Sequence, residues 1–148
     1  MFFLKELPGR HMVEGYAARF DNVDPDTVLG ALELMRSASL LIRELEAYFA
    51  GHDLSQLRFL TLILIDREPK RTSLTASEIA ERLDVSRPVV TRTLKSLERS
   101  GLIAIASDEE DGRSKKVSLS AAGSATLEAV LPGYFAILHR RTSSSQEG

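Results

Sequence analysis

Residues 74–103, LTASEIAERLDVSRPVVTRTLKSLERSGLI, constrain the fold of this 148-residue chain more than any other segment. Thr75 and Glu78 form the T-x-x-E pattern that starts a helix, because each side chain can bond a backbone N–H group at the other position. This first helix should bury Ile79, Ala80 and Leu83. After a two-residue turn, Ser86 is expected to cap a second helix, which Gly101 ends. Two short helices joined so closely predict a helix-turn-helix.

The second helix has one apolar and one cationic face. At 100° per residue its apolar side holds Val90, Thr93, Leu94 and Leu97, and its opposite side holds Pro88, Thr91, Arg92, Lys95 and Arg99. Such a helix fits the DNA major groove, where Arg and Lys donate to guanine and Thr contacts a base edge. Ser86 and Arg87 are expected to meet phosphate, because the start of a helix favours an anion. The alternative, a solvated cationic face, is less favoured beside a helix-turn-helix.

A β-hairpin is expected directly after this helix. The stretches LIAIAS and VSLS are β-prone and flank an Asp-Gly turn, which favours pairing of the two strands. Four acids, Asp108 to Asp111, precede the turn, whereas Arg113, Lys115 and Lys116 follow it. Any cationic contact made by the hairpin should therefore come from the returning strand.

Helices are expected on both sides of this region. Met12, Tyr16 and Phe20 recur every fourth residue after Pro8, and Asp24 and Pro25 are typical of the start of a long helix over 25–50. That helix is apolar around much of its circumference, so it is either a central core helix or packs against a second chain.

The remaining helices are expected after residue 51 and after residue 119. Asp53 or Ser55 should cap the first of these, and Pro69 should close it. Ser120 should cap the last helix, which Pro132 should kink, and the polar tail should be disordered.

Composition limits the function further. The chain has no cysteine, which excludes disulfides, thiolate metal sites and thiol chemistry. Its net charge is -2, but residues 70–116 carry ten Lys/Arg and eight Asp/Glu, against nine and thirteen elsewhere. Binding of nucleic acid must therefore depend on where the basic side chains point.

We expect no enzyme, cofactor or metal site. The three histidines, His11, His52 and His139, are scattered, and no catalytic motif is present. A metal held by His52, His139 and Glu46 is a less favoured alternative to surface or capping roles. No apolar stretch approaches the roughly 20 residues needed to span a bilayer, and the first residues lack the features of a signal peptide, which predicts no membrane contact and a cytoplasmic location.

From Leu54 to about Leu131 the sequence resembles the MarR (multiple antibiotic resistance regulator) family of bacterial transcriptional regulators. The helix-turn-helix segment and DEEDGRSKKVSLSAAG carry the resemblance, the latter being similar to a family pattern of D-x-R-D-x-R, a strand and Leu-Thr-x-x-Gly. It implies a mainly α fold with a small β-hairpin wing, a winged helix-turn-helix plus N- and C-terminal dimerisation helices. Glu110 departs from the pattern by replacing an arginine, and the last helix is shortened.

The resemblance also implies a function, that of a transcriptional repressor. The protein would act as a homodimer that binds double-stranded DNA at a pseudo-palindromic operator. The implied major-groove residues are Ser86, Arg87, Pro88, Thr91, Arg92 and Lys95, with Arg113 as the wing-tip arginine and Lys115 behind it. A small aromatic or anionic effector is implied near the helices that carry Arg43, Tyr48 and Arg58.

The implied domains are N-terminal dimerisation helices (1–53), the DNA-binding domain (54–120), a C-terminal dimerisation helix (121–142) and a disordered tail (143–148). Apolar residues of the N-terminal segment are expected to cross the dimer axis: Phe2, Phe3, Leu4, Leu7, Met12, Tyr16 and Phe20. The alternative function is a winged helix that binds another protein and has no operator, which would more often carry apolar or acidic groups at Arg92, Lys95 and Arg113.

Overall fold

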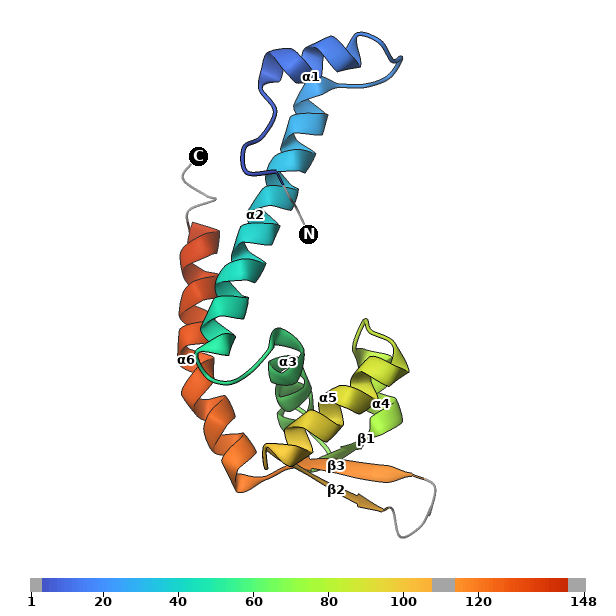
Figure 1. Cartoon of the computed structure of the whole chain (residues 1–148), viewed down its shortest axis with the longest axis vertical. Coiled ribbons are helices and arrows are strands. Elements are labelled where there is room, and N and C mark those ends of the chain that lie inside the picture. The colour runs from blue at the N-terminus through green and yellow to red at the C-terminus, as the bar shows by residue number, and fades with distance from the viewer. Residues whose placement is uncertain (1–3, 108–113, 144–148) are drawn as a thin grey trace. The chain divides into compact units, whose positions relative to one another are not determined.

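The structure, a computed structural model, describes residues 4–107 and 114–143 (Figure 1). Its helices are α1 (Arg10–Ala17), α2 (Pro25–Ala50), α3 (Gln56–Asp66), α4 (Ala76–Arg82), α5 (Arg87–Arg99) and α6 (Ala121–Ser143). Its strands are β1 (Ser73–Thr75), β2 (Ile103–Ser107) and β3 (Lys115–Leu119). The chain divides into two compact units, residues 1–45 and 46–148.

The N-terminal unit contains α1 and most of α2. Asp24 caps α2 as predicted: its carboxylate accepts from the Thr27 hydroxyl at 2.6 Å and from the Thr27 backbone N–H at 2.8 Å. These two bonds lower the pKa of Asp24. Arg10 on α1 contacts Glu14 at 2.9 Å and also pairs with Asp26, so it joins α1 to the first turn of α2.

Large apolar side chains of this unit are exposed. On α1, Val13 and Ala17 are buried, whereas Met12, Tyr16 and the following Phe20 are 57%, 59% and 60% exposed. On α2, Leu34, Met35 and Ile42 are exposed as well. A single chain therefore leaves part of the apolar surface of both helices uncovered, and α2 is not a core helix buried on every side.

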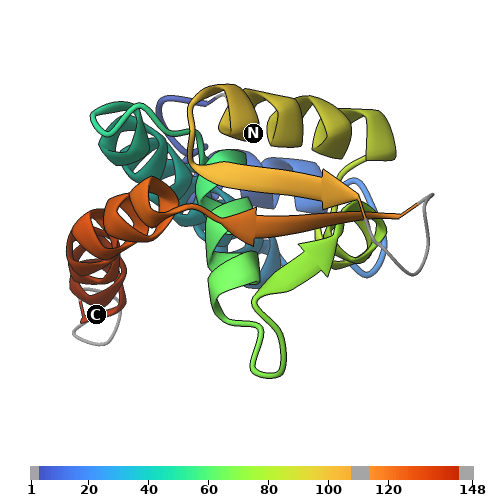
Figure 2. The same ribbon diagram turned by 90° about the horizontal axis from the view of Figure 1, so that it is seen from below.

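The second unit is built on a three-stranded antiparallel sheet. The strand order is β1-β3-β2, so the middle strand is β3, as Figure 2 shows. Leu74, Val117 and Ile105 lie in register across the three strands, and the first two are fully buried. This row faces the core, which also contains Phe59, Ile79 and Leu97. The predicted class, mainly α with a small hairpin wing, is confirmed.

Ser120 caps α6 as predicted: its hydroxyl oxygen accepts from the Gly123 N–H at 3.0 Å. The helix continues through Pro132. Beside that proline, the Tyr48 hydroxyl donates to the Val130 carbonyl at 2.8 Å. Tyr48 lies so close to Gly133 that an added Cβ would overlap its phenol ring. The end of α2 is thus fitted closely to the middle of α6.

Helix α6 corrects one expectation about apolar stretches. Among the described residues, Ala121–Arg140 is long and apolar enough to cross a membrane by length and composition alone, with a mean hydropathy of 1.3. The core helix of a soluble protein passes the same test. The sequence pattern did not point to this stretch because its alanines raise the mean hydropathy without forming a run of large apolar side chains. Leu127, Val130 and Ile137 of this stretch are buried.

Candidate nucleic-acid interface

The first helix of the predicted pair is fixed at its start by a complete capping box. Thr75 Oγ1 accepts from the Glu78 N–H at 3.2 Å, and Glu78 Oε2 accepts from the Thr75 N–H at 2.7 Å. Arg71 Nη2 also contacts Glu78 Oε1 at 2.7 Å. The bond from Arg71 and the bond from the Thr75 backbone lower the pKa of Glu78 to about 2. The carboxylate is therefore ionised at neutral pH and fixes the start of α4.

A second ion pair fixes the other end of α4. Arg82 Nη1 contacts Glu68 Oε2 at 2.8 Å, and this bond lowers the pKa of Glu68. Because Glu68 and Arg71 both belong to the connection from α3 to β1, the two pairs tie that connection to both ends of α4. Sequence reasoning missed them, since Glu68 and Arg82 are 14 residues apart and no periodic pattern relates them.

Helix α5 has the two faces predicted for it. Val90, Leu94 and Leu97 are buried. The opposite face is exposed and consists of Pro88, Thr91, Arg92, Lys95 and Arg99, and Ser86 and Arg87 are exposed at its start. The buried face holds α5 against the core, so its cationic face is presented on a fixed support.

The start of α5 differs from the prediction in one respect. Ser86 occupies the N-cap position, but its side chain makes no capping hydrogen bond. A capping side chain normally accepts from the second or third N–H of the helix. Here the second residue is Pro88, which has no N–H, and the N–H of Val89 bonds the Ser86 carbonyl at 3.0 Å. The Ser86 hydroxyl is therefore not committed to capping α5.

The end of α5 is anchored from two directions. Gly101 has φ of 71°, and Leu102 N–H bonds the Leu97 carbonyl at 3.0 Å, which closes the helix. Arg58 Nη2 on α3 donates to Ser100 Oγ at 2.8 Å. From the α6 side, Ser120 Oγ donates to the Gly101 carbonyl at 2.5 Å. Gly123 packs so closely on the Leu102 carbonyl that a Cβ there would overlap it.

The described part of the wing, strands β2 and β3, lies beside α5. Thr91 and Lys95 of α5 and Lys115 of β3 line one cavity of about 350 Å³, which we call the inner cavity. Three of the predicted DNA-binding side chains thus come together, although they are up to 24 residues apart in sequence. Arg113, the predicted wing-tip arginine, and the acids 108–111 lie outside the described residues.

The side chains considered for an effector have structural partners. The Arg58 guanidinium also donates to the Asp53 carbonyl at 2.7 Å, and Tyr48 bonds α6. Arg43 lines a cavity of about 120 Å³ within residues 1–45. His52, considered for a metal, lies edge-on to the Tyr48 ring. Over the part of the chain that the structure describes, no three His, Asp or Glu side chains group in a way that could hold a metal ion.

Strand β1 was not predicted. It is three residues long and runs directly into the capping box, and Thr75 belongs to both. The only sequence signal was the alternation of Ser73, Leu74 and Thr75, which is too short to distinguish from a loop. Pairing with β3 makes this segment a strand, and that pairing is tertiary.

Comparisons with known proteins agree with this geometry. Residues 52–114 match the sequence model of the MarR family. The chain is 32% identical over 132 residues to the HTH-type transcriptional repressor YetL of Bacillus subtilis, an alignment that covers 89% of this chain and 78% of YetL.

Solved structures are similar as well. The fold matches that of AbsC, a MarR family transcriptional regulator from Streptomyces coelicolor, with a TM-score of 0.75 at 18% identity and 82% coverage of each chain. It also matches MepR of S. aureus in a DNA complex, with a TM-score of 0.69 at 25% identity, covering 76% of this chain and 82% of MepR.

Proposed function

The chain belongs to the MarR family of winged helix-turn-helix transcriptional regulators, and we propose that it is a repressor that binds a pseudo-palindromic operator as a homodimer in the cytoplasm. As a member of that family it is a DNA-binding regulator and not an enzyme. The name of its relative YetL, a repressor, supports the direction of regulation. The structural observation that carries the proposal is the exposed cationic face of α5, held on a buried apolar face and adjoining the wing.

In this proposal α5 enters the major groove and the wing reaches the neighbouring minor groove. Arg92 and Lys95 donate to base edges or phosphates, and Thr91 contacts a base edge. Ser86, Arg87 and Pro88 lie at the helix start, where backbone N–H groups and the helix dipole favour a phosphate. Lys115, and Arg113 beyond the described residues, serve the minor-groove side.

The proposed dimer uses the exposed apolar groups of α1 and α2. Such large side chains, uncovered in one chain, are typical of an interface between subunits. We propose residues 1–53 and 121–142 as the dimerisation helices and residues 54–120 as the DNA-binding domain. Two recognition helices related by a two-fold axis would then meet half-sites about 10 bp apart.

The test of DNA binding is selection of bound duplexes from a random pool, followed by titration of the chosen site. Arg92→Ala should weaken that site by about 1–3 kcal/mol and relax the base preference at one position in each half-site. Arg99→Ala removes an equal charge from the other end of the same face and should leave the base preference unchanged. A chain that selects no sequence at any salt concentration, and binds random DNA only weakly, would instead be a protein-binding winged helix.

We further propose that a small aromatic or anionic ligand releases the operator. A panel of aromatic acids added to the selected complex, with binding followed by fluorescence anisotropy, tests this step. A ligand that dissociates the specific complex while leaving binding to random DNA unchanged would support it. No effect of any panel member at millimolar concentration would contradict it for this class of ligand.

A further inference from the structure

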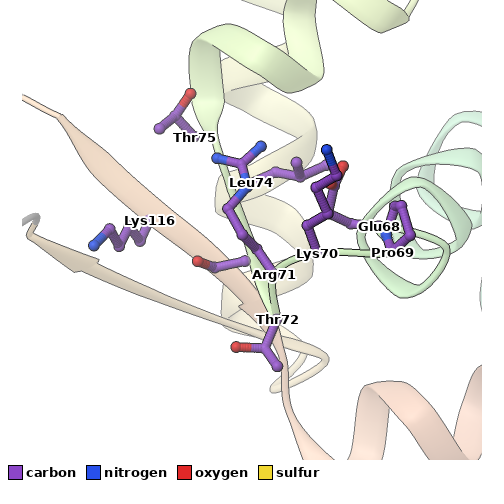
Figure 3. Close-up of a pocket in the computed structure, with 9 residues that line it drawn as sticks. Glu68, Pro69, Lys70, Arg71, Thr72, Leu74, Thr75 and Lys116 are labelled. Atoms are coloured by element: carbon purple, nitrogen blue, oxygen red, sulfur yellow. The ribbon is translucent and has the colours of Figure 1, made fainter.

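A second cavity, of about 670 Å³, lies outside the interface described above. Figure 3 shows Lys70 and Arg71 on the segment that leads into β1 and Lys116 on the neighbouring strand β3, all lining this cavity. Three hydroxyl groups, those of Thr72, Ser73 and Thr75, share the lining. We call it the outer cavity. Cations together with hydroxyl donors are groups that bind a phosphate.

Strand β3 connects the two cavities. Consecutive side chains of a strand point to opposite faces of the sheet. Val117 is buried, and Lys115, two residues away, lies on the same side and lines the inner cavity with Thr91 and Lys95. Lys116 lies on the other side and lines the outer cavity. The returning strand of the wing therefore directs adjacent lysines to its two faces.

The carboxylates near the outer cavity repel an anion less than free carboxylates would, because each is paired with an arginine. Glu68 is paired with Arg82, and Glu78 is paired with Arg71. The Arg71 pair also orients its guanidinium, which has five N–H donors and remains half-exposed beside the cavity. Lys70 and Thr72 are exposed at the rim.

We propose that the outer cavity binds a phosphate of the DNA backbone. A wing that lies in the minor groove has one sugar–phosphate strand on each of its sides. Lys115 faces the strand nearer the recognition helix, and Lys70, Arg71 and Lys116 face the other strand. This inference rests on the proposed function, since it assigns a second phosphate contact to the same DNA complex.

The experiment compares the salt dependence of DNA binding among charge variants. Lys70→Gln and Lys116→Gln each remove a cation from the outer cavity. Arg67→Gln removes an exposed cation of the same connection that does not line the cavity, and is the matched control. Each lost phosphate contact should lower the slope of log affinity against log salt by about 0.9, so the ratio of affinities at 50 and 200 mM salt should fall about threefold.

The expected result is a reduced slope for Lys70→Gln and for Lys116→Gln, with an unchanged slope for Arg67→Gln. Wild-type slopes for all three variants, with thermal unfolding that shows each is folded, would overturn the proposal. Because phosphate contacts do not require an operator, the slopes are measured on a random duplex as well as on the selected site. Failure to select a site is then a failure of the proposed function, whereas wild-type slopes for Lys70→Gln and Lys116→Gln on both duplexes are a failure of the outer cavity.

Discussion

Glu78 makes several interactions through one side chain. It pairs with Arg71 and, as the third residue of α4, completes the capping box with Thr75. Since its folded pKa of about 2 lies below the usual 4.5, ionised Glu78 stabilises the fold above pH 4.5. This contribution is lost as the pH falls from 4.5 towards 2. Glu78→Gln keeps the capping pattern but cannot pair as an ion. Urea unfolding of the two proteins should show stabilities that differ at pH 7 and converge by pH 2 to 3, and a constant difference would contradict this.

Gly133 is a residue whose side chain must be absent for α6 to fit. Gly133→Ala would place a Cβ on the Tyr48 ring, so we expect destabilisation of about 1–3 kcal/mol despite the better helix propensity of alanine. Replacing Tyr48 with Ala in the same chain should remove most of the added penalty. A double-mutant cycle measured by urea unfolding checks this coupling, and strictly additive effects would show that the two residues do not clash.

At the scale of single residues, the sequence predicted contacts that depend on near neighbours. The Thr75–Glu78 box and the Asp24 and Ser120 caps formed as their spacing predicted. Ser86 failed as a side-chain cap because Pro88 removes one donor and the Ser86 carbonyl takes the other. Partners distant in sequence, such as Glu68 and Arg82, could not be predicted because only the folded chain brings them together.

At the scale of elements, the turn that ends α5 depends on one backbone conformation. Gly101 has positive φ and open space around it, so Gly101→Ala should cost about 1–2 kcal/mol through the backbone alone. Gly101→Asn should cost less, because asparagine tolerates this conformation. Gly30 lies inside α2, also in open space, and Gly30→Ala should stabilise by up to about 1 kcal/mol. Chemical denaturation of the three variants measures these changes in the free energy of unfolding. Equal changes for Gly101→Ala and Gly30→Ala would contradict the prediction.

Elements with a strong periodic pattern could be predicted from the sequence, whereas strand β1, whose pattern is weak, could not. Helices α2 and α5 and the hairpin follow from apolar spacing, caps and the Asp-Gly turn. Strand β1 depends on β3, which lies more than 40 residues later. The same tertiary pairing creates the outer cavity, so no sequence pattern pointed to Lys70 and Lys116 as neighbours.

At the scale of the whole molecule, assembly is expected to depend on the exposed apolar side chains of α1 and of the residues directly after it. Replacing Met12, Tyr16 and Phe20 with serine should convert the proposed dimer to monomers, because these groups are exposed in one chain and their burial would be lost. His11→Ser changes an exposed polar residue of the same helix and is the control. Sedimentation equilibrium measures the association. A stable dimer of the triple variant, or of a chain lacking residues 1–20, would show that α1 is not required.

Because α5 is anchored at one end, the angle at which it leaves that end decides where its first turn lies, and the proposed DNA contacts depend on that position. Helix α5 is tied to Arg58, Ser120 and the close approach of Gly123 at its C-terminal end, whereas its first turn carries no side-chain cap. A helix of 13 residues is about 20 Å long, so a pivot of about 10° at the anchored end moves the first turn by roughly 3 Å. That displacement equals the length of a hydrogen bond. In the proposed DNA complex, a slight turn where α6 begins would therefore be amplified along α5 until base contacts at the far end no longer align.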